Sequence, residues 1–400
     1  MIRLTLGLVA AAIAVSPAVA VVPVYGQCGG RNYSGETACA SGSACIAQSE
    51  WYSQCLPGAS TTPTPIPTTT ATTAPPPPAS TGFVKTSGTK FTLNGAPFTV
   101  VGTNSYWVGL NGLSTANMNT AFQDIARTGA TAVRTWGFNE VTSQNGNWYQ
   151  GWTGRTSTVN SGASGLQNFD NVVAAAKANG LRLIVALADY GGMDVYVNQI
   201  VGQGQPHDLF YTNANVKPRC KGTTGTTSGS CTPATITAWA KEMTAYIKSI
   251  DSNHLVGVGD EGFFNQPGAP TYPYQGGDGI DFDANLAIST VDFGTFHEPW
   301  GQTNNATAWG VQWIQDHAAS QKRIGKPVII EEFGVTTNQL STYTSWLNTV
   351  ISSGLAGDLI WQAGSRLPTG PTADDGYTIY PDDPVYPLLT GHAAALKARG

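Results

Sequence analysis

The sequence predicts an α/β fold, a (β/α)8 or TIM barrel over residues 82–400, preceded by a small disulfide-rich β module. Three observations lead to this prediction. Short apolar, β-branched segments alternate with helical patterns that end at glycine, as in parallel βα units. Four of the 6 cysteines crowd into residues 28–55, which are too few to bury a core of their own. A Thr/Pro-rich segment at 59–81 separates the two parts.

The first twenty residues have the pattern of a secretory signal peptide. Arg3 precedes an almost wholly apolar run from Leu4 to Val15, and Ala18 and Ala20 form a small-x-small cleavage site. A membrane anchor is the alternative, but the run is shorter than the roughly 20 residues that a span requires. We therefore expect residues 1–20 to be removed from a secreted, extracellular protein whose cysteines form disulfides.

Residues 21–58 form the predicted β module. Zinc binding is an alternative to disulfides, but the cysteine spacings lack the short CxxC pairs of a metal site. So small a body cannot bury Tyr25, Trp51 and Tyr52, and exposed rings of this kind can stack on sugar faces.

The segments Tyr25–Gly30 and Trp51–Cys55 resemble the fungal family 1 carbohydrate-binding module. The resemblance implies the disulfides Cys28–Cys45 and Cys39–Cys55. It also implies that Tyr25, Trp51 and Tyr52 form a flat face for cellulose or a similar crystalline polysaccharide.

Residues 59–81 are almost all Thr, Pro, Ser and Ala, which predicts a stiff spacer suited to O-glycosylation. In the remaining large domain, Cys220 and Cys231 lie in a Gly/Thr/Ser loop and are expected to pair with each other. Asn32 and Asn305 stand in N-glycosylation sequons, which the secretory route would make available.

Within 82–400 we predict seven strands and four helices, and the segment between Leu187 and Leu255 holds one helix but no strand. An eight-stranded barrel needs another βα unit there, so the fourth unit is expected to be lost. The predicted strands are Phe98–Thr103, Thr131–Thr135, Leu181–Leu187, Leu255–Gly259, Val291–Phe296, Pro327–Glu331 and Asp358–Gln362. The predicted helices are Ala116–Thr128, Asn168–Asn179, Thr235–Ile250 and Thr307–Ile324.

The carboxyl ends of these strands, where barrel enzymes place their functional groups, carry carboxylates, one Arg, one His and several Trp. Paired carboxylates beside tryptophan platforms are typical of glycoside hydrolysis. The composition agrees, because 11% charged residues at net charge −5 offer no basic face for a nucleic acid. A surface with so few charges suits an uncharged polar ligand, such as a carbohydrate, better than a nucleic acid.

Glu331 and Glu332 are adjacent on a strand, so they are expected to point to opposite faces, and only one can face the barrel axis. The ending Glu332-Phe333-Gly334 resembles the nucleophile strand of glycoside hydrolase family 5. The resemblance implies that Glu332 is the nucleophile and that Glu331 supports it or faces a helix.

The wider resemblance is to the secreted fungal endo-β-1,4-mannanases of that family and covers nearly all of 82–400. The stretches that carry it are Gly102–Trp107, Val133–Asn139, Asp189–Asp194, Pro218–Cys220, Gly259–Phe263 and Ile360–Gln362. It implies retaining hydrolysis of mannans, galactomannans and glucomannans by a monomer without metal or organic cofactor, and without nucleic-acid or membrane partners. The sugar-binding residues that it implies are Trp107, Arg134, Arg219, Glu261, His297 and Trp361, with Arg134 also holding Glu332 ionised.

The sequence departs from the family pattern at the catalytic rim. The family's fourth strand ends in Asn-Glu-Pro-Arg-Cys, whose Glu is the general acid/base, but here Asn213–Lys217 precedes Pro218–Cys220 and no Glu is found. The usual turn after the third strand and the Tyr-Pro after His297 are missing too. Glu261 or Glu298 would need a raised pKa and a place on the leaving-group side to substitute.

We therefore predict a mannanase of reduced activity. A non-catalytic polysaccharide-binding protein and a cellulase or β-glucanase of the same family are the alternatives that the sequence leaves open.

Overall fold

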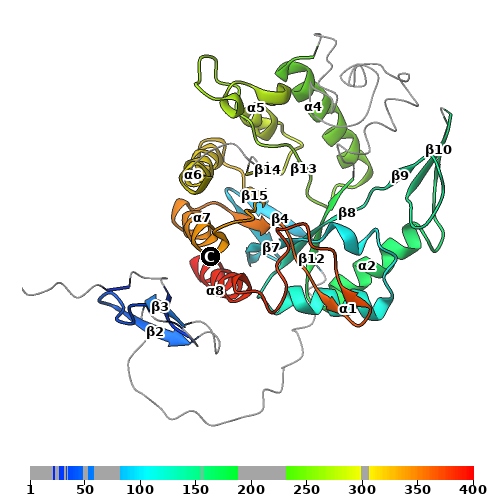
Figure 1. The fold of residues 1–400 in the computed structure, drawn as a ribbon. Coiled ribbons are helices and arrows are strands. Elements are labelled where there is room, and N and C mark those ends of the chain that lie inside the picture. The colour runs from blue at the N-terminus through cyan, green and yellow to red at the C-terminus, as the bar shows by residue number, and fades with distance from the viewer. Residues whose placement is uncertain are drawn as a thin grey trace, which may run out of the picture. The chain divides into compact units, whose positions relative to one another are not determined.

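Figure 1 shows the fold of the chain as a computed structural model. It describes residues 21–22, 27–30, 33, 35–47, 53–57, 82–154, 156–187, 231–298 and 306–400. The chain divides into two compact units between Thr69 and Thr70, inside the predicted spacer.

The N-terminal unit contains a three-stranded antiparallel sheet in the order β1-β3-β2, with β1 at Gln27–Gly29, β2 at Ser43–Ala47 and β3 at Ser53–Pro57. The predicted disulfides Cys28–Cys45 and Cys39–Cys55 are confirmed, so these sulfurs are not free to bind zinc. The predicted aromatic face (Tyr25, Trp51 and Tyr52) and the sequon residue Asn32 lie outside the described residues.

The large unit is built on a curled parallel sheet, which confirms the predicted α/β barrel class. Its seven described strands run in the order β12-β8-β7-β16-β15-β14-β13. Strands that follow each other in the chain are therefore neighbours, except β12 and β13, which form the two edges. The predicted missing fourth unit belongs between them, and residues 188–230 of this interval lie outside the described part. The strands are β7 Val100–Asn104, β8 Ala132–Trp136, β12 Arg182–Ala186, β13 Gly257–Val258, β14 Phe293–His297, β15 Val328–Glu332 and β16 Gly357–Ile360.

Helices pack around the outside of this sheet (Figure 1). Four of them match the predicted helices: α1 Thr115–Ala126, α2 Leu166–Ala178, α4 Pro233–Ile250 and α6 Ala306–Ile324. Gly129 and Gly180 have positive φ angles, as expected for residues that follow a helix end. Three of the described helices were not predicted from the sequence: α5 Phe282–Ala287, α7 Gln339–Ser353 and α8 Val385–Arg399.

Short antiparallel elements lie outside the parallel sheet. They are β4 Val84–Ser87, β5 Lys90–Leu93, β6 Ala96–Phe98, β10 Gln150–Thr153 with β11 Thr156–Val159, and β17 Arg366–Leu367 with β18 Gly370–Pro371. A two-residue strand, β9 Glu140–Val141, pairs in parallel with β10. The first barrel strand was predicted to begin at Phe98, but Phe98 belongs to β6 and pairs with Phe91. β7 begins two residues later.

The core lies between the sheet and the helices and fixes where the strands end. Trp313 of α6 and Trp346 and Tyr343 of α7 are buried against it. A second cluster packs α1 and α2 against β8. No helix in the described ranges is both long and apolar enough to span a membrane.

Candidate active site

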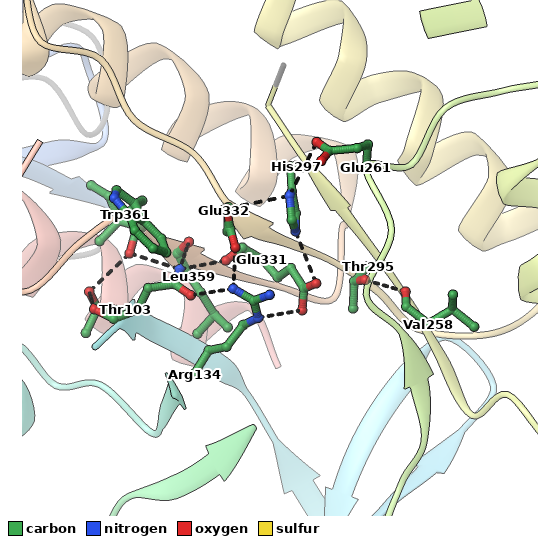
Figure 2. A network of polar contacts seen from close by, with 12 residues as sticks. Thr103, Arg134, Val258, Glu261, Thr295, His297, Glu331, Glu332, Leu359 and Trp361 are labelled. Atoms are coloured by element: carbon green, nitrogen blue, oxygen red, sulfur yellow. Dashed lines mark hydrogen bonds and ion pairs between the residues drawn. The ribbon is translucent and has the colours of Figure 1, made fainter. Parts of the chain in front are cut away.

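The centre of the candidate site is Glu332, the last residue of β15, which is 15% exposed at its side chain. Arg134 reaches it from β8, on the opposite side of the curled sheet, and its Nη1 donates to Glu332 Oε1 (Figure 2). The same Nη1 donates to Asn104 Oδ1 at 3.0 Å, and Arg134 Nε lies 3.4 Å from Glu331 Oε2. Arg134 is therefore shared by two adjacent glutamates, and its hydrogen bond to Glu332 is charge-assisted.

His297, at the end of β14, lies among three glutamates (Figure 2). Its Nε2 is 3.2 Å from Glu331 Oε1, while its Nδ1 is 3.4 Å from Glu261 Oε2 and 3.5 Å from Glu332 Oε2. The structure thus brings the predicted residues Glu332, Arg134, His297 and Glu261 into one cluster.

The expectation that Glu331 and Glu332 point to opposite faces is wrong in its simple form. Both carboxylates contact Arg134 and His297. The pairing of β14 with β15 shifts register here, because Phe296 lies opposite Ile330 but His297 lies opposite Glu332. Glu331 is the extra residue of this bulge, which breaks the strict alternation of side chains.

Glu331 is nevertheless the supporting residue of the pair. Burial alone would raise its pKa, but the charge of Arg134 and the hydrogen bond with His297 outweigh burial and lower it. Glu331 therefore stays ionised inside the protein.

Asn104, at the end of β7, is a residue of the site that sequence reasoning did not assign a role. It is 1% exposed, accepts from Arg134 and donates its Nδ2 to the Glu331 carbonyl at 2.7 Å. It fixes Arg134 relative to β15. The available signal was its position at a strand end inside the segment Gly102–Trp107.

The two tryptophans that were predicted to line sugar subsites, Trp361 and Trp107, lie in different environments. Trp361 follows β16 and lies at the rim, where Tyr106 stacks on it with ring centroids 5.5 Å apart and an interplanar angle of 6°. Trp107 is 3% exposed, packs in the core and donates its Nε1 to the Ala363 carbonyl. The prediction that Trp107 lines a sugar subsite is wrong, because the 3-10 turn Tyr106–Val108 presents Tyr106 to the rim instead.

Glu261 and Glu298 are the two candidate substitutes for the general acid that the sequence lacks. Glu261 contacts His297, as described above. Burial raises the pKa of Glu298 to about 8, and its backbone N–H donates to the Glu332 carbonyl at 2.8 Å. Residues 188–230, where the fourth strand would be expected, contain no glutamate in the sequence.

Several predicted residues lie outside the described part of the chain, namely Arg219, Cys220 and Asn305. Cys231 is disulfide-bonded. The cysteines Cys28, Cys39 and Cys45 lie close enough to suggest a metal site, but all three are in disulfides.

The comparisons with known proteins match both units. Residues 101–366 match the family described as Cellulase (glycosyl hydrolase family 5), and residues 24–52 match the Fungal cellulose binding domain. The chain is 37% identical to the probable mannan endo-1,4-beta-mannosidase F of Emericella nidulans, over 94% of this chain and 95% of that protein. It is 38% identical to the solved endo-1,4-beta-mannanase of Rhizomucor miehei, with a TM-score of 0.72, covering 79% of this chain and all of that one.

One further alignment bears on the missing βα unit. Mannan endo-1,4-beta-mannosidase A of Podospora anserina is 37% identical over 353 aligned positions that cover 78% of this chain. Because 78% of 400 residues is about 312, about 41 of those 353 positions have no counterpart here. These unmatched positions, taken together, are comparable in number to one βα unit. By the extent of these matches, the chain belongs to glycosyl hydrolase family 5 and carries a fungal cellulose-binding domain before its barrel.

Proposed function

We propose that this chain is a retaining endo-β-1,4-mannanase that acts on mannans, galactomannans and glucomannans, with Glu332 as its nucleophile. The observation that carries the proposal is the position of Glu332 at the end of β15, where Arg134 and His297 both contact its carboxylate. The mannanase relatives support mannan as the substrate, because they are similar over nearly their whole length.

The site residues suggest how such a reaction would proceed. The Glu332 carboxylate attacks the anomeric carbon, the glycosidic C–O bond breaks, and the departing oxygen takes up a proton. Water then cleaves the glycosyl ester and restores Glu332. Trp361 offers a face for stacking a sugar ring, and His297, Glu261 and Arg219 are the proposed partners of sugar hydroxyls.

The proposed site lacks an assigned proton donor. The sequence has no glutamate in residues 188–230, where the family's acid/base residue is expected, so the unactivated linkages of mannan should be cleaved slowly. This observation favours a second candidate function, a polysaccharide-binding protein with little or no turnover. A cellulase or β-glucanase of the same family is distinguished by its products.

Around the barrel, we propose the organisation expected from the sequence. Residues 1–20 are a signal peptide for secretion, residues 21–58 bind cellulose through Tyr25, Trp51 and Tyr52, and residues 59–81 act as the spacer. Residues 82–400 form the catalytic domain of a monomer. The match of residues 24–52 to the fungal cellulose binding domain supports the module's role.

The experiment compares two substrates with different leaving groups. A dinitrophenyl β-mannobioside needs little help from an acid, whereas galactomannan needs a proton donor. We expect the full chain to cleave the aryl mannobioside with retained configuration and galactomannan much more slowly. Glu332→Gln should abolish both activities, and Glu242→Gln, on helix α4, is the matched control.

Three other results would contradict the proposed function or the role of Glu332. Binding of mannan without cleavage of either substrate identifies a binding protein. Faster cleavage of cellulose or β-glucan than of mannan excludes a mannanase. Full activity in Glu332→Gln removes Glu332 from the nucleophile role.

A further inference from the structure

The loop of residues 372–379 returns from the β17–β18 hairpin to the rim beside Trp361. Backbone hydrogen bonds attach it there, because Ile379 N–H donates to the Gln362 carbonyl at 2.9 Å and Gly364 N–H donates to the Ile379 carbonyl at 2.8 Å. The loop and the end of β16 therefore form one connected piece of structure.

Asp375 of this loop holds the Trp361 side chain by its edge. Its Oδ2 accepts hydrogen bonds from Trp361 Nε1 and from Gln362 Nε2, both at 2.8 Å. Its Oδ1 accepts from the backbone N–H of Tyr377 at 3.0 Å and from Thr378 Oγ1 at 2.9 Å. All four bonds restrain the carboxylate, and one of them fixes the rotation of the indole about its side-chain bonds.

The charge of Asp375 strengthens this contact. Burial alone would raise its pKa, but the hydrogen bonds from Trp361, Tyr377, Thr378 and Gln362 outweigh burial and lower it. The carboxylate is therefore ionised at neutral pH, and hydrogen bonds to an ionised acceptor are about twice as strong as neutral ones.

Tyr106 restrains the same indole on one face. Its ring is nearly parallel to that of Trp361, at 6°, with the centroids 5.5 Å apart. With the N–H edge held by Asp375 and one face covered by Tyr106, the plane of the indole is fixed before any sugar arrives. A preorganised stacking surface loses less entropy on binding than a mobile one.

We propose that Asp375 is a positioning residue for the polysaccharide substrate, holding Trp361 in the orientation in which a mannose ring stacks on it. This inference rests on the proposed function, since it takes Trp361 as a sugar platform. Asp375 acts through Trp361 and not through contact with the sugar.

The test measures binding of mannohexaose to the full chain by calorimetry, in a Glu332→Gln background that does not consume the ligand. Asp375→Ala should weaken binding by up to about tenfold, because the released indole must be ordered again when the sugar binds. The matched control is Asp374→Ala, because Asp374 lies in the same loop but bonds the Gly376 N–H, and its affinity should not change. In a Trp361→Ala background, Asp375→Ala should cause no further loss.

The outcomes separate the two proposals. Equal affinity of Asp375→Ala and Asp374→Ala overturns the positioning role, and so does a further tenfold loss in the Trp361→Ala background. If mannohexaose does not bind at all, the proposed function fails, and near-ultraviolet circular dichroism of the tryptophans still tests the positioning. Asp375→Ala should change that spectrum, Asp374→Ala should not, and the change should be absent in Trp361→Ala; an unchanged spectrum contradicts the inference.

Discussion

Replacing Arg134 by Met tests the charge arrangement of the site without relying on catalysis. The side chain of Arg134 is 10% exposed, and it forms ion pairs with Glu331, 3% exposed, and Glu332, 15% exposed. Met keeps much of the volume and removes the charge. The buried carboxylate of Glu331 then keeps His297 as its nearest ionisable partner, at 3.2 Å.

Arg134→Met should lower the free energy of unfolding strongly, because a buried ion pair loses one of its two charges. Breaking such a pair typically destabilises a protein by about 3–5 kcal/mol. For a domain of residues 82–400, at about 2.1 cal/mol/K of unfolding entropy per residue, that lowers Tm by about 4–8 °C.

The loss of stability in Arg134→Met should depend on pH, because the protonation of Glu331 depends on pH. In the natural chain its pKa is lowered, so its ionised form stabilises the fold above its ordinary value of 4.5, and this stabilisation is lost as the pH falls through the lowered pKa. Without Arg134, burial becomes the larger influence and raises the pKa. The ionised Glu331 carboxylate then destabilises the folded variant at neutral pH. The stability of the variant increases as the pH falls and this carboxyl takes up a proton.

Thermal unfolding followed by circular dichroism at pH 7, 5 and 4 measures this difference. We expect the gap in Tm between Arg134→Met and the natural chain to be largest at pH 7 and smallest at pH 4. The double variant Arg134→Met/Glu331→Gln should be more stable at pH 7 than Arg134→Met alone. A gap that stays constant with pH, or a double variant no more stable than the single one, would refute the reasoning.

Three further predictions concern other parts of the chain. Turnover of galactomannan should be about 10²–10⁴-fold below that of a family member with its acid/base Glu, as measured by reducing-end release; equal rates would show that a proton donor is present. Cys28→Ser/Cys45→Ser opens a loop with a sequence separation of 17, which should cost the module about 3 kcal/mol, and unchanged cellulose retention after mild heating would count against it. Gly102→Ala places a Cβ 1.8 Å from the Ala132 carbonyl oxygen, so Tm should fall, whereas an unchanged Tm would contradict this close contact.

The sequence predicted the parallel strands best where a short apolar run stands next to a recognisable helix, as at β12, which follows α2. It did not predict α7, whose Ser- and Thr-rich sequence has low helix propensity and whose first turn follows Asn338 with no side-chain cap. Tertiary packing of Tyr343 and Trp346 in the core compensates for that weakness.

At the site, residue types were easier to predict than side-chain directions. Glu332, Arg134 and His297 came together as expected because the carboxyl ends of parallel strands meet at one edge. Glu331 was misplaced because a bulge interrupts the alternation of side chains on which its prediction depended. Trp107, which the family resemblance placed at a sugar subsite, is buried by a 3-10 turn. Asp375 lies in the loop after the β17–β18 hairpin and not at the end of a parallel strand, and only the folded chain brings it to Trp361.

The contact between Arg134 and Glu332 also has a mechanical consequence. β8 and β15 are separated in the sheet by β7 and β16. The ion pair therefore connects two strands that share no backbone hydrogen bonds. In a closed cylinder the ring of backbone hydrogen bonds sets the curvature, but the described strands form an arc with β12 and β13 at its ends. The ion pair between Arg134 and Glu332 then adds a side-chain link to the backbone pairing of the described strands.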